Sequence, residues 1–273
     1  MIVSTIDSGL GNRIKCLLSC MRIDDNTKLV WPKNGSTSCD FSELFENDLE
    51  IVYIPENAEK RFNERLLVLD SDDIPEGFAQ EHPDKNFDTV DNNKQRKKVE
   101  VNNGRNIDHE YERIPESIKE SYIEQVRKLK PVKYISKEIE SFASKNFNKN
   151  TVSVHMRSWA NYPRRQCLFS FENYFKYMDE MTDNNFFVCA DHQGCIDTLK
   201  ERYGDRVFDY SKRGGKGNYC EGTAYMNTTE ASQDAIIEMY LLGMNPTILG
   251  SYLSTFVEVG WWLNECKGKV IIV

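Results

Sequence analysis

The chain has 273 residues, 40% of them hydrophobic, and a formal net charge of −8 at pH 7. This length suits one large domain or two domains of roughly 100 to 150 residues, with enough apolar side chains for packed cores. The acidic balance argues against nucleic acid as a partner, because phosphate neutralisation needs a basic surface, but it permits a locally basic site for an acidic small molecule.

The first residues and the cysteines bear on the cellular compartment. Residues 1–7 contain neither the basic nor the apolar segment of a secretion signal. No stretch approaches the roughly 20 apolar residues of a transmembrane helix. None of the eight cysteines forms a C-x-x-C pair, which argues against a zinc ribbon or a thioredoxin-like site. We therefore expect a cytoplasmic protein with reduced thiols and no transmembrane segment.

The chain begins with a pattern of strand, glycine-rich turn and helix. Residues 2–6 predict a strand, and apolar residues at helical spacing from Ile14 to Met21 predict a helix. Gly9 and Gly11 lie between them and permit a close backbone approach, so that N–H groups could face an anion. A dinucleotide-binding motif would have its third glycine at Ile14, which weakens a nicotinamide-binding interpretation. An ordinary tight turn is the alternative.

The rest of the first half alternates between short strands and helices. Strands are predicted at 29–32, 50–54 and 65–69, and helices at 41–45, 116–130 and 136–147. This alternation indicates βαβ units and a parallel sheet. Residues 80–114 are polar and include the basic cluster 94–98, which predicts a surface excursion. We expect the last two helices to bridge two halves and place a domain boundary at 140/141.

The second half opens with a strand at 151–157 in which Val152, Val154 and Met156 face one way. Ser153, His155 and Arg157 face the other way, because successive side chains of a strand alternate. His155 and Arg157 thus lie at the carboxyl end of a strand, where open α/β sheets bind ligands. Arginine offers a planar fork for phosphate or carboxylate, and histidine can donate, accept or carry a proton. A solvated strand end is the alternative.

The pattern of strand and helix then repeats to the end of the chain. Strands are predicted at 185–190, 206–209, 247–250 and 270–273, and helices at 170–181, 196–203, 230–242 and 256–264. The basic loop 211–218 suits either closure over a phosphate or plain solvation. Four turns follow predicted strands, at residues 9–13, 155–157, 191–192 and 251–255. In two facing α/β domains these turns could open into one cleft for an anionic, nucleotide-sized ligand.

Three of these segments resemble a known family. Gly-Leu-Gly-Asn-Arg at 9–13, Val-His-Met-Arg at 154–157 and Gly-Ser-Tyr-Leu-Ser-Thr-Phe at 250–256 are similar to motifs of the fucosyltransferase superfamily. That superfamily joins nodulation and alpha-1,6-fucosyltransferases, protein O-fucosyltransferases and, more distantly, alpha-1,2-fucosyltransferases. The resemblance implies an α/β fold of GT-B type, in which two Rossmann-like domains with parallel sheets face each other. Residues 1–140 would form the acceptor side and residues 141–273 the nucleotide-sugar donor side.

The resemblance also implies roles for individual residues. Arg157 would contact the β-phosphate of the donor and stabilise the leaving nucleoside diphosphate, and His155 would orient the donor. Asp191 would recognise the guanosine, and Asp234 would lie near the donor. The remaining donor-binding positions are Gly9, Gly11, Asn12 and Arg13 under the diphosphate or sugar, and Ser251, Ser254 and Thr255 at the phosphate oxygens. The base for the acceptor hydroxyl stays open between Asp7, Glu43 and His155.

The expected activity is inverting, metal-independent transfer of fucose from GDP-fucose to a glycan such as a polysaccharide precursor, with no cofactor. The chain departs from the family after Arg157, where Ser158-Trp159-Ala160 follows and the second arginine and the acidic residue of the family motif are missing. Arg164 and Arg165 could supply the missing charge. A non-catalytic nucleotide- or carbohydrate-binding protein of the same fold is the alternative, and a Rossmann oxidoreductase is a third interpretation.

Overall fold

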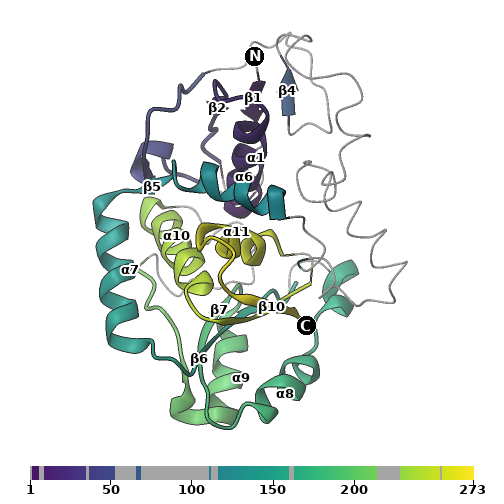
Figure 1. The fold of residues 1–273 in the computed structure, drawn as a ribbon. Helices are drawn as coiled ribbons and strands as arrows, with labels where there is room; N and C mark the ends of the chain where they lie inside the picture. The colour runs from purple at the N-terminus through teal and green to yellow at the C-terminus, as the bar shows by residue number, and fades with distance from the viewer. Residues whose placement is uncertain are drawn as a thin grey trace.

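The computed structural model describes residues 2–5, 9–34, 37–52, 66–68, 111, 116–159, 163–213, 228–252 and 254–273. These residues form a larger C-terminal sheet with helices on both faces and a smaller N-terminal sheet (Figure 1). Several predicted features lie outside the described residues: Asp7, most of the surface excursion 80–114 with its basic cluster 94–98, the side chains of Arg164 and Arg165, and residues 214–218 of the basic loop.

The C-terminal half contains a five-stranded parallel sheet in the order β10-β9-β6-β7-β8. Its strands are β6 (Thr151–Met156), β7 (Asn185–Ala190), β8 (Val207–Phe208), β9 (Thr247–Gly250) and β10 (Lys269–Ile272). Four helices connect them: α8 (Phe171–Glu180), α9 (Gln193–Tyr203), α10 (Thr229–Gly243) and α11 (Thr255–Leu263). The short helices η3 (Pro163–Leu168) and η4 (Gly204–Arg206) precede α8 and β8. The predicted parallel sheet is confirmed in this half.

The alternation predicted for β6 is confirmed, and both faces of the strand are buried. Val152, Val154 and Met156 belong to one hydrophobic cluster with residues of α8 and α9. His155 faces the other side, where its ring stacks on Phe256 of α11 at a centroid distance of 5.2 Å. The strand end is therefore covered rather than solvated, which excludes the simplest alternative for His155.

Helix α7 (Lys133–Asn146) packs on the same sheet and on α10. Phe142 of α7 lies 5.5 Å from Phe187 of β7 between ring centroids, and Phe147, just after the helix, lies 5.2 Å from the same ring. The expected boundary at 140/141 falls inside this helix. The aromatic contacts group α7 with the C-terminal sheet, because burying these rings joins the helix to its strands.

The N-terminal half contains shorter elements and a mixed sheet in the order β2-β1-β4. Its elements are β1 (Ile2–Thr5), α1 (Leu10–Ile23), β2 (Lys28–Val30), η1 (Phe41–Glu43), β3 (Phe45–Glu46), β4 (Leu66–Val68), α6 (Glu116–Val126) and β5 (Lys130–Pro131). Strand β1 is parallel to β2 but antiparallel to β4, and β3 pairs antiparallel with β5. The strand predicted at 50–54 is reduced, in the described residues, to one parallel bridge between Leu29 and Ile51.

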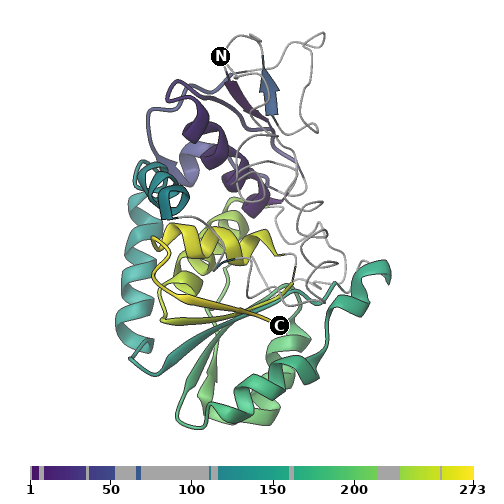
Figure 2. The same ribbon diagram turned by 45° about the vertical axis from the view of Figure 1, so that its right-hand side comes forward.

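Helix α11 lies between the C-terminal sheet and the N-terminal helices α1 and α6 (Figure 2). Tyr122 of α6 stacks on Trp262 of α11 at 4.2 Å between ring centroids. Lys15 of α1 forms a buried ion pair with Glu258 of α11. One hydrophobic cluster includes residues of both halves. The two halves therefore share a packed interface through α11.

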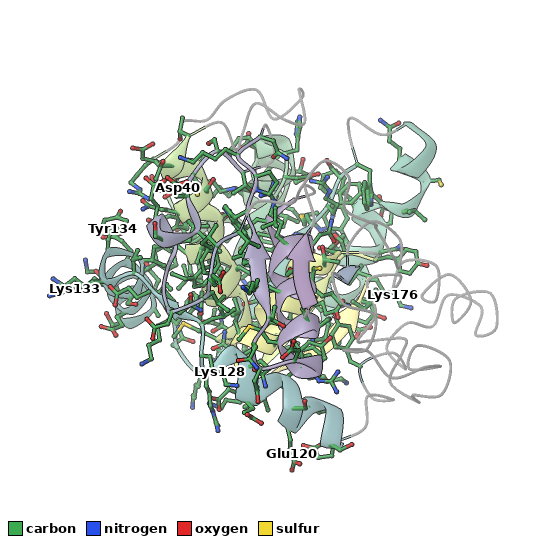
Figure 3. All side chains as sticks on the ribbon, turned by 90° about the horizontal axis from the view of Figure 1, so that it is seen from above. Asp40, Glu120, Lys128, Lys133, Tyr134 and Lys176 are labelled. Atoms are coloured by element: carbon green, nitrogen blue, oxygen red, sulfur yellow. The ribbon has the colours of Figure 1, made fainter. Side chains whose placement is uncertain are left out.

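Charged side chains project outward over the described surface, as Asp40, Glu120, Lys128, Lys133 and Lys176 show in Figure 3. None of the described helices combines the length and the apolar character needed to cross a membrane.

Candidate active site

The C-terminal sheet has a topological switch point between β6 and β9. From β6 the chain proceeds through β7 to β8 on one side, whereas β9 and β10 continue the sheet on the other. In open α/β sheets, ligands bind outside the carboxyl ends of strands at such a point. His155 pairs in register with Gly250 there, and Arg157 and Ser251 follow directly. The topology therefore places two of the predicted segments together at the favoured position (Figure 1).

Ser251 ties the ends of β6 and β9 together. The backbone N–H of Arg157 donates to Ser251 Oγ at 2.6 Å, and this hydroxyl donates to the carbonyl of His155 at 3.0 Å. Tyr174 of α8 donates to the same carbonyl at 2.9 Å and lies 2.6 Å from Ser251 Oγ. Burial raises the pKa of Tyr174, so its hydroxyl keeps its proton. These contacts give Ser251 and Tyr174 a framework role in shaping the strand ends.

The guanidinium of Arg157 is held from two sides. Its Nη1 atom lies 3.1 Å from Asp191 Oδ2, and its Cζ atom lies 4.9 Å from the ring centroid of Trp159. The other Asp191 oxygen accepts the backbone N–H of Ser158 at 2.8 Å. Trp159 has a φ of 56°, a conformation that is rare for bulky residues and often found at functional sites. Because 36% of the Arg157 side chain stays exposed, it is both oriented and open to a ligand.

His155 is buried and electrically neutral. Burial, followed by the positive charges of Arg157 and Lys212, lowers its pKa to about 3. Its Nδ1 atom is buried and has no hydrogen-bond partner within the described residues. A base of such low pKa holds a proton weakly at neutral pH, which argues against His155 as the general base. A neutral imidazole can instead donate or accept a hydrogen bond.

The N-termini of α1 and α11 lie against each other. A Cβ atom placed on Gly11 would lie 3.1 Å from the backbone nitrogen of Phe256 and 3.2 Å from the carbonyl carbon of Thr255. Ser254 caps α11 by accepting the N–H of Val257 at 3.4 Å. Helix N-termini carry partial positive charge and free N–H groups, which favour anions. The glycine turn and the Ser254–Thr255 turn, predicted to meet, are therefore adjacent.

Arg13 is directed away from this group by the contacts in the structure. Its guanidinium donates to the carbonyl of Pro32 at 2.7 Å and to Asn34 Oδ1 at 3.0 Å, and it lies over the ring of Trp31. The side chain is only 1% exposed. These contacts stabilise the segment after β2. Gly9, which caps α1, is exposed, and Asn12 is partly buried beside it.

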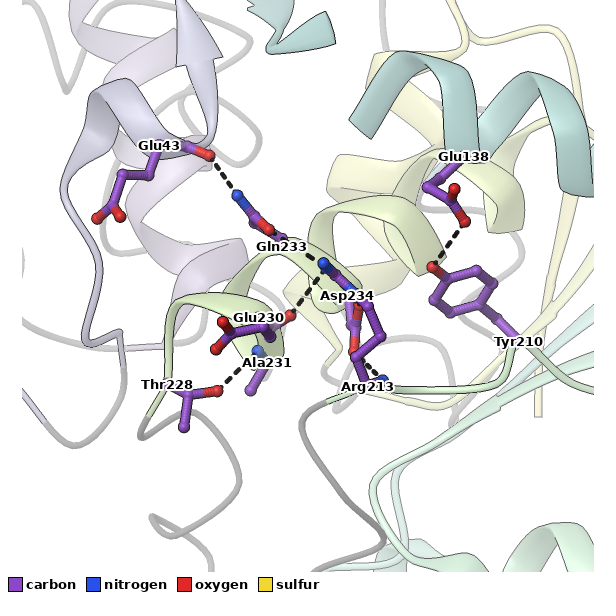
Figure 4. A network of polar contacts seen from close by, with 9 residues as sticks. All are labelled: Glu43, Glu138, Tyr210, Arg213, Thr228, Glu230, Ala231, Gln233 and Asp234. Carbon is purple, nitrogen blue, oxygen red and sulfur yellow. Dashed lines mark hydrogen bonds and ion pairs between the residues drawn. The ribbon is translucent and has the colours of Figure 1, made fainter. Parts of the chain in front are cut away.

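Asp234 and Glu43 belong to a separate polar network around the start of α10 (Figure 4). Asp234 accepts the backbone N–H of Arg213 at 2.6 Å and its Nε–H at 2.9 Å. Gln233 donates to the carbonyl of Glu43 at 3.0 Å and accepts from Arg213 at 3.2 Å. The carboxylate of Glu43 also accepts the N–H of Asp40 in a capping box. Both acidic residues are engaged in fixing local structure.

Sequence reasoning missed the pairing of Lys212 with Glu238, which lies next to His155. Lys212 Nζ lies 3.0 Å from Glu238 Oε2, and both side chains are buried. The basic loop was expected to close over phosphate or to be solvated, but its first residues Lys212 and Arg213 are held in ion pairs. A glutamate amid the apolar residues of α10 was the available signal, since buried carboxylates need partners.

No protein-family model matches the sequence, and no curated protein matches it either. Solved structures do match the fold. The NodZ alpha-1,6-fucosyltransferase soaked with GDP-fucose has a TM-score of 0.56 and 17% identity, covering 96% of this chain and 91% of that chain. NodZ from Bradyrhizobium gives 0.55 and 17%, covering 94% and 90%. POFUT1 in its apo form gives 0.52 and 14%, covering 99% and 96%.

These similarities show that the chain has the fold of the GT-B fucosyltransferases NodZ and POFUT1. The α/β fold class predicted from three short motifs is thereby confirmed, with a parallel sheet in the C-terminal half, whereas the N-terminal sheet is mixed rather than parallel. Identity this low defines the fold alone, and function must be argued from the site.

Proposed function

We propose that this chain is an inverting, metal-independent fucosyltransferase that transfers fucose from GDP-fucose to a hydroxyl of a glycan. One observation carries the proposal most directly. Arg157, oriented by Asp191 and Trp159, lies at the switch point of the parallel sheet, where nucleotide ligands bind in this type of fold. A structure of the same fold was soaked with GDP-fucose.

The chemistry of glycosyl transfer fits these side chains. Breaking the bond between sugar and phosphate leaves negative charge on the diphosphate while the sugar becomes oxocarbenium-like. A guanidinium and backbone N–H groups held in advance stabilise that charge without a metal ion. In this proposal Arg157 binds the β-phosphate, and Ser254 and Thr255 bring the N-terminus of α11 to the phosphate oxygens.

Gly9, Gly11 and Asn12 would line the same region from α1, because Gly11 contacts the start of α11. His155 would orient the donor as a neutral hydrogen-bonding group. Residues 1–140 would provide the acceptor side and residues 141–273 the donor side. The enzyme would act in the cytoplasm on a polysaccharide precursor.

The general base is proposed to come from the N-terminal half. His155 is disfavoured by its low pKa, and Glu43 is engaged in its capping box and by Thr229, which donates to its carboxylate at 3.3 Å. Asp7 follows β1 and precedes the glycine turn in sequence, so it becomes the first candidate. Asp7→Asn should abolish transfer and leave GDP affinity unchanged, whereas Glu43→Gln should retain transfer. The opposite result would assign the base to Glu43.

A non-catalytic binding protein of this fold is the second candidate. It is motivated by Ser158-Trp159-Ala160, which lacks the second arginine and the acidic residue of the family motif. The two proposals separate in one experiment, in which the protein is incubated with GDP-fucose and the release of GDP is measured. We expect protein-dependent release of GDP, and binding without release would favour the second candidate.

A further inference from the structure

Lys212 crosses the edge of the sheet to reach a helix that covers it. The residue follows β8, yet its ammonium lies 3.0 Å from Glu238 Oε2 on α10 and 3.4 Å from the carbonyl of Ala190. Ala190 is the last residue of β7 and pairs in register with Met156 at the end of β6. The buried charge of Lys212 is therefore placed at the same carboxyl edge that carries Arg157.

This pair lies on the face of the sheet that His155 occupies. His155 pairs in register with Cys189, whose thiol lies 3.8 Å from the carbonyl of Glu238. The charge of Lys212 acts on both His155 and Cys189. Lys212 and Glu238 thus lie on the His155 face of the sheet, beside the strand ends where the diphosphate is proposed to bind.

The pair of Lys212 and Glu238 does more than join the segment after β8 to α10. Lys15 and Glu258 form a second buried pair, but it connects α1 to α11, and neither of its charges is among those that shift the pKa of His155. Buried ion pairs contribute little net stability compared with apolar residues of similar size, because both charges lose their hydration. The role of the Lys212–Glu238 pair is therefore inferred from where the pair lies and not from its contribution to the stability of the protein.

We propose that Lys212, with Glu238 as its counter-ion, is a positioning residue for the diphosphate at the ends of β6 and β7. The ammonium fixes the end of β7 and adds positive potential behind Arg157 without touching the ligand. This inference rests on the proposed function for the identity of the ligand.

Glu238 makes this potential dependent on pH. Burial raises its pKa to about 7, although Lys212 opposes that shift, and its Oε1 atom has no partner within the described residues. The titratable and charged groups around it are Lys212 and Asp209 after β8, Asp234 on α10 with its partner Arg213, Cys189 on β7 and His155 on β6. Below pH 7 a neutral Glu238 leaves the charge of Lys212 uncompensated, and above pH 7 the carboxylate cancels it.

The test is the dissociation constant for GDP, measured by calorimetry at about pH 6 and about pH 8. Lys212→Met should weaken binding about tenfold at about pH 6, where the charge of Lys212 is uncompensated, and by less at about pH 8, since neighbouring groups in one network couple by this amount. Glu238→Gln, which mimics the neutral acid, should bind about threefold more tightly than the wild type at the higher pH and equally at the lower pH. The titration of GDP itself affects both proteins equally, so it cancels when the dissociation constant of the wild type is divided by that of Glu238→Gln at the same pH.

Lys15→Met is the matched control, because it removes a buried lysine from the other pair and should leave the pH dependence unchanged. Two results would overturn the inference. One is a Lys212→Met variant that binds GDP as tightly as the wild type, and the other is a ratio of the wild-type to the Glu238→Gln dissociation constant that does not change with pH. If Lys212→Met fails to fold, the neutral pair Lys212→Gln/Glu238→Gln takes its place, with the tenfold loss expected at about pH 6, where the wild-type pair carries a net positive charge.

Failure of the proposed function gives a different result. If the wild type binds no GDP at either pH, the titration of His155 by nuclear magnetic resonance decides the inference alone. Lys212→Met should then raise the pKa of His155, whereas Lys15→Met should not, and an unmoved pKa in Lys212→Met would overturn the positioning role.

Discussion

The strands of the two halves of this molecule differ in length and in how they are paired. In the C-terminal half, β6 and β7 each have six residues and form the centre of a parallel sheet that is covered on both faces. In the N-terminal half, β1 is flanked by strands of three residues, one parallel and one antiparallel. Long covered strands hold their ends in fixed positions, and the residues that we propose to bind a diphosphate lie at those ends.

In the described residues, the N-terminal half reaches the proposed site through helix α1 rather than through its sheet. Gly11 allows α1 to approach the start of α11 closely, and the buried pair of Lys15 and Glu258 joins the same two helices. We therefore propose that the C-terminal strand ends stabilise the charge of the diphosphate and that the contact between α1 and α11 aligns the two halves. Separate substitutions can test each role.

Removal of the Arg157 guanidinium should have the largest effect. Arg157→Ala should lower the rate of GDP release from GDP-fucose on the order of 10²-fold or more, as the loss of a preorganised donor does. Arg206→Ala is the matched control, because Arg206 donates to the carbonyl of Asn184 at the opposite end of β7. Near-normal turnover in Arg157→Ala would remove this residue from the mechanism.

A methyl group between the two helix N-termini should have the next largest effect. In Gly11→Ala the new Cβ atom meets the backbone of Thr255 and Phe256 at 3.2 and 3.1 Å, which must move apart. We expect a loss of about 1–3 kcal/mol in the free energy of unfolding, as overpacking causes, together with weaker GDP binding. Gly9→Ala places its methyl where no atom lies within 4 Å, so it should destabilise the protein less than Gly11→Ala, by about 0.5–1 kcal/mol from the weaker N-cap of α1. Equal destabilisation in both variants would contradict the close approach.

The buried imidazole should make stability depend on pH. The pKa of His155 is lowered from 6.5 to about 3, so the unfolded chain binds more protons between these values and the folded state loses stability as pH falls. The contribution is on the order of 2 kcal/mol between roughly pH 6.5 and pH 5. Glu238 has the opposite sign, because its raised pKa favours the folded state as pH falls from 7 toward 4.5.

The measurement must therefore compare the wild type with His155→Asn by urea denaturation at each pH. Asparagine should remove the contribution of His155 and leave that of Glu238. Parallel stability curves for the two proteins would show that His155 titrates normally in the folded state.

Chelation should have the smallest effect. If Arg157 and the helix N–H groups neutralise the leaving diphosphate, GDP release should be unchanged after treatment with EDTA. A strict requirement for Mg²⁺ or Mn²⁺ would contradict the proposed mechanism, and restoration by added metal would identify the ion.

The sequence predicted the C-terminal sheet well because its signal is local. Alternation along β6 and helical spacing along α8 and α10 follow from which face each side chain buries. The direction of β4 was not predictable in this way, since antiparallel pairing with β1 depends on distant chain segments. The sequence therefore did not predict that the N-terminal sheet is mixed.

The same distinction applies to the site. Position along a strand placed His155, Arg157 and Ser251 at one edge of the sheet. It could not reveal that Asp191 holds Arg157, that Arg13 binds the carbonyl of Pro32, or that Asp234 binds Arg213. These partners are set by how separate elements pack, so a charged residue in the sequence indicates only that some partner is needed.

The central claim is that the strand ends of the C-terminal sheet bind a guanosine diphosphate. The most direct test is a thermal-shift panel with GDP, UDP, ADP, TDP and NAD, because a ligand that binds only the folded state raises its stability. We expect stabilisation by GDP above the other four and loss of that shift in Arg157→Ala. Preference for UDP, TDP or NAD, or an equal GDP shift in Arg157→Ala, would contradict it.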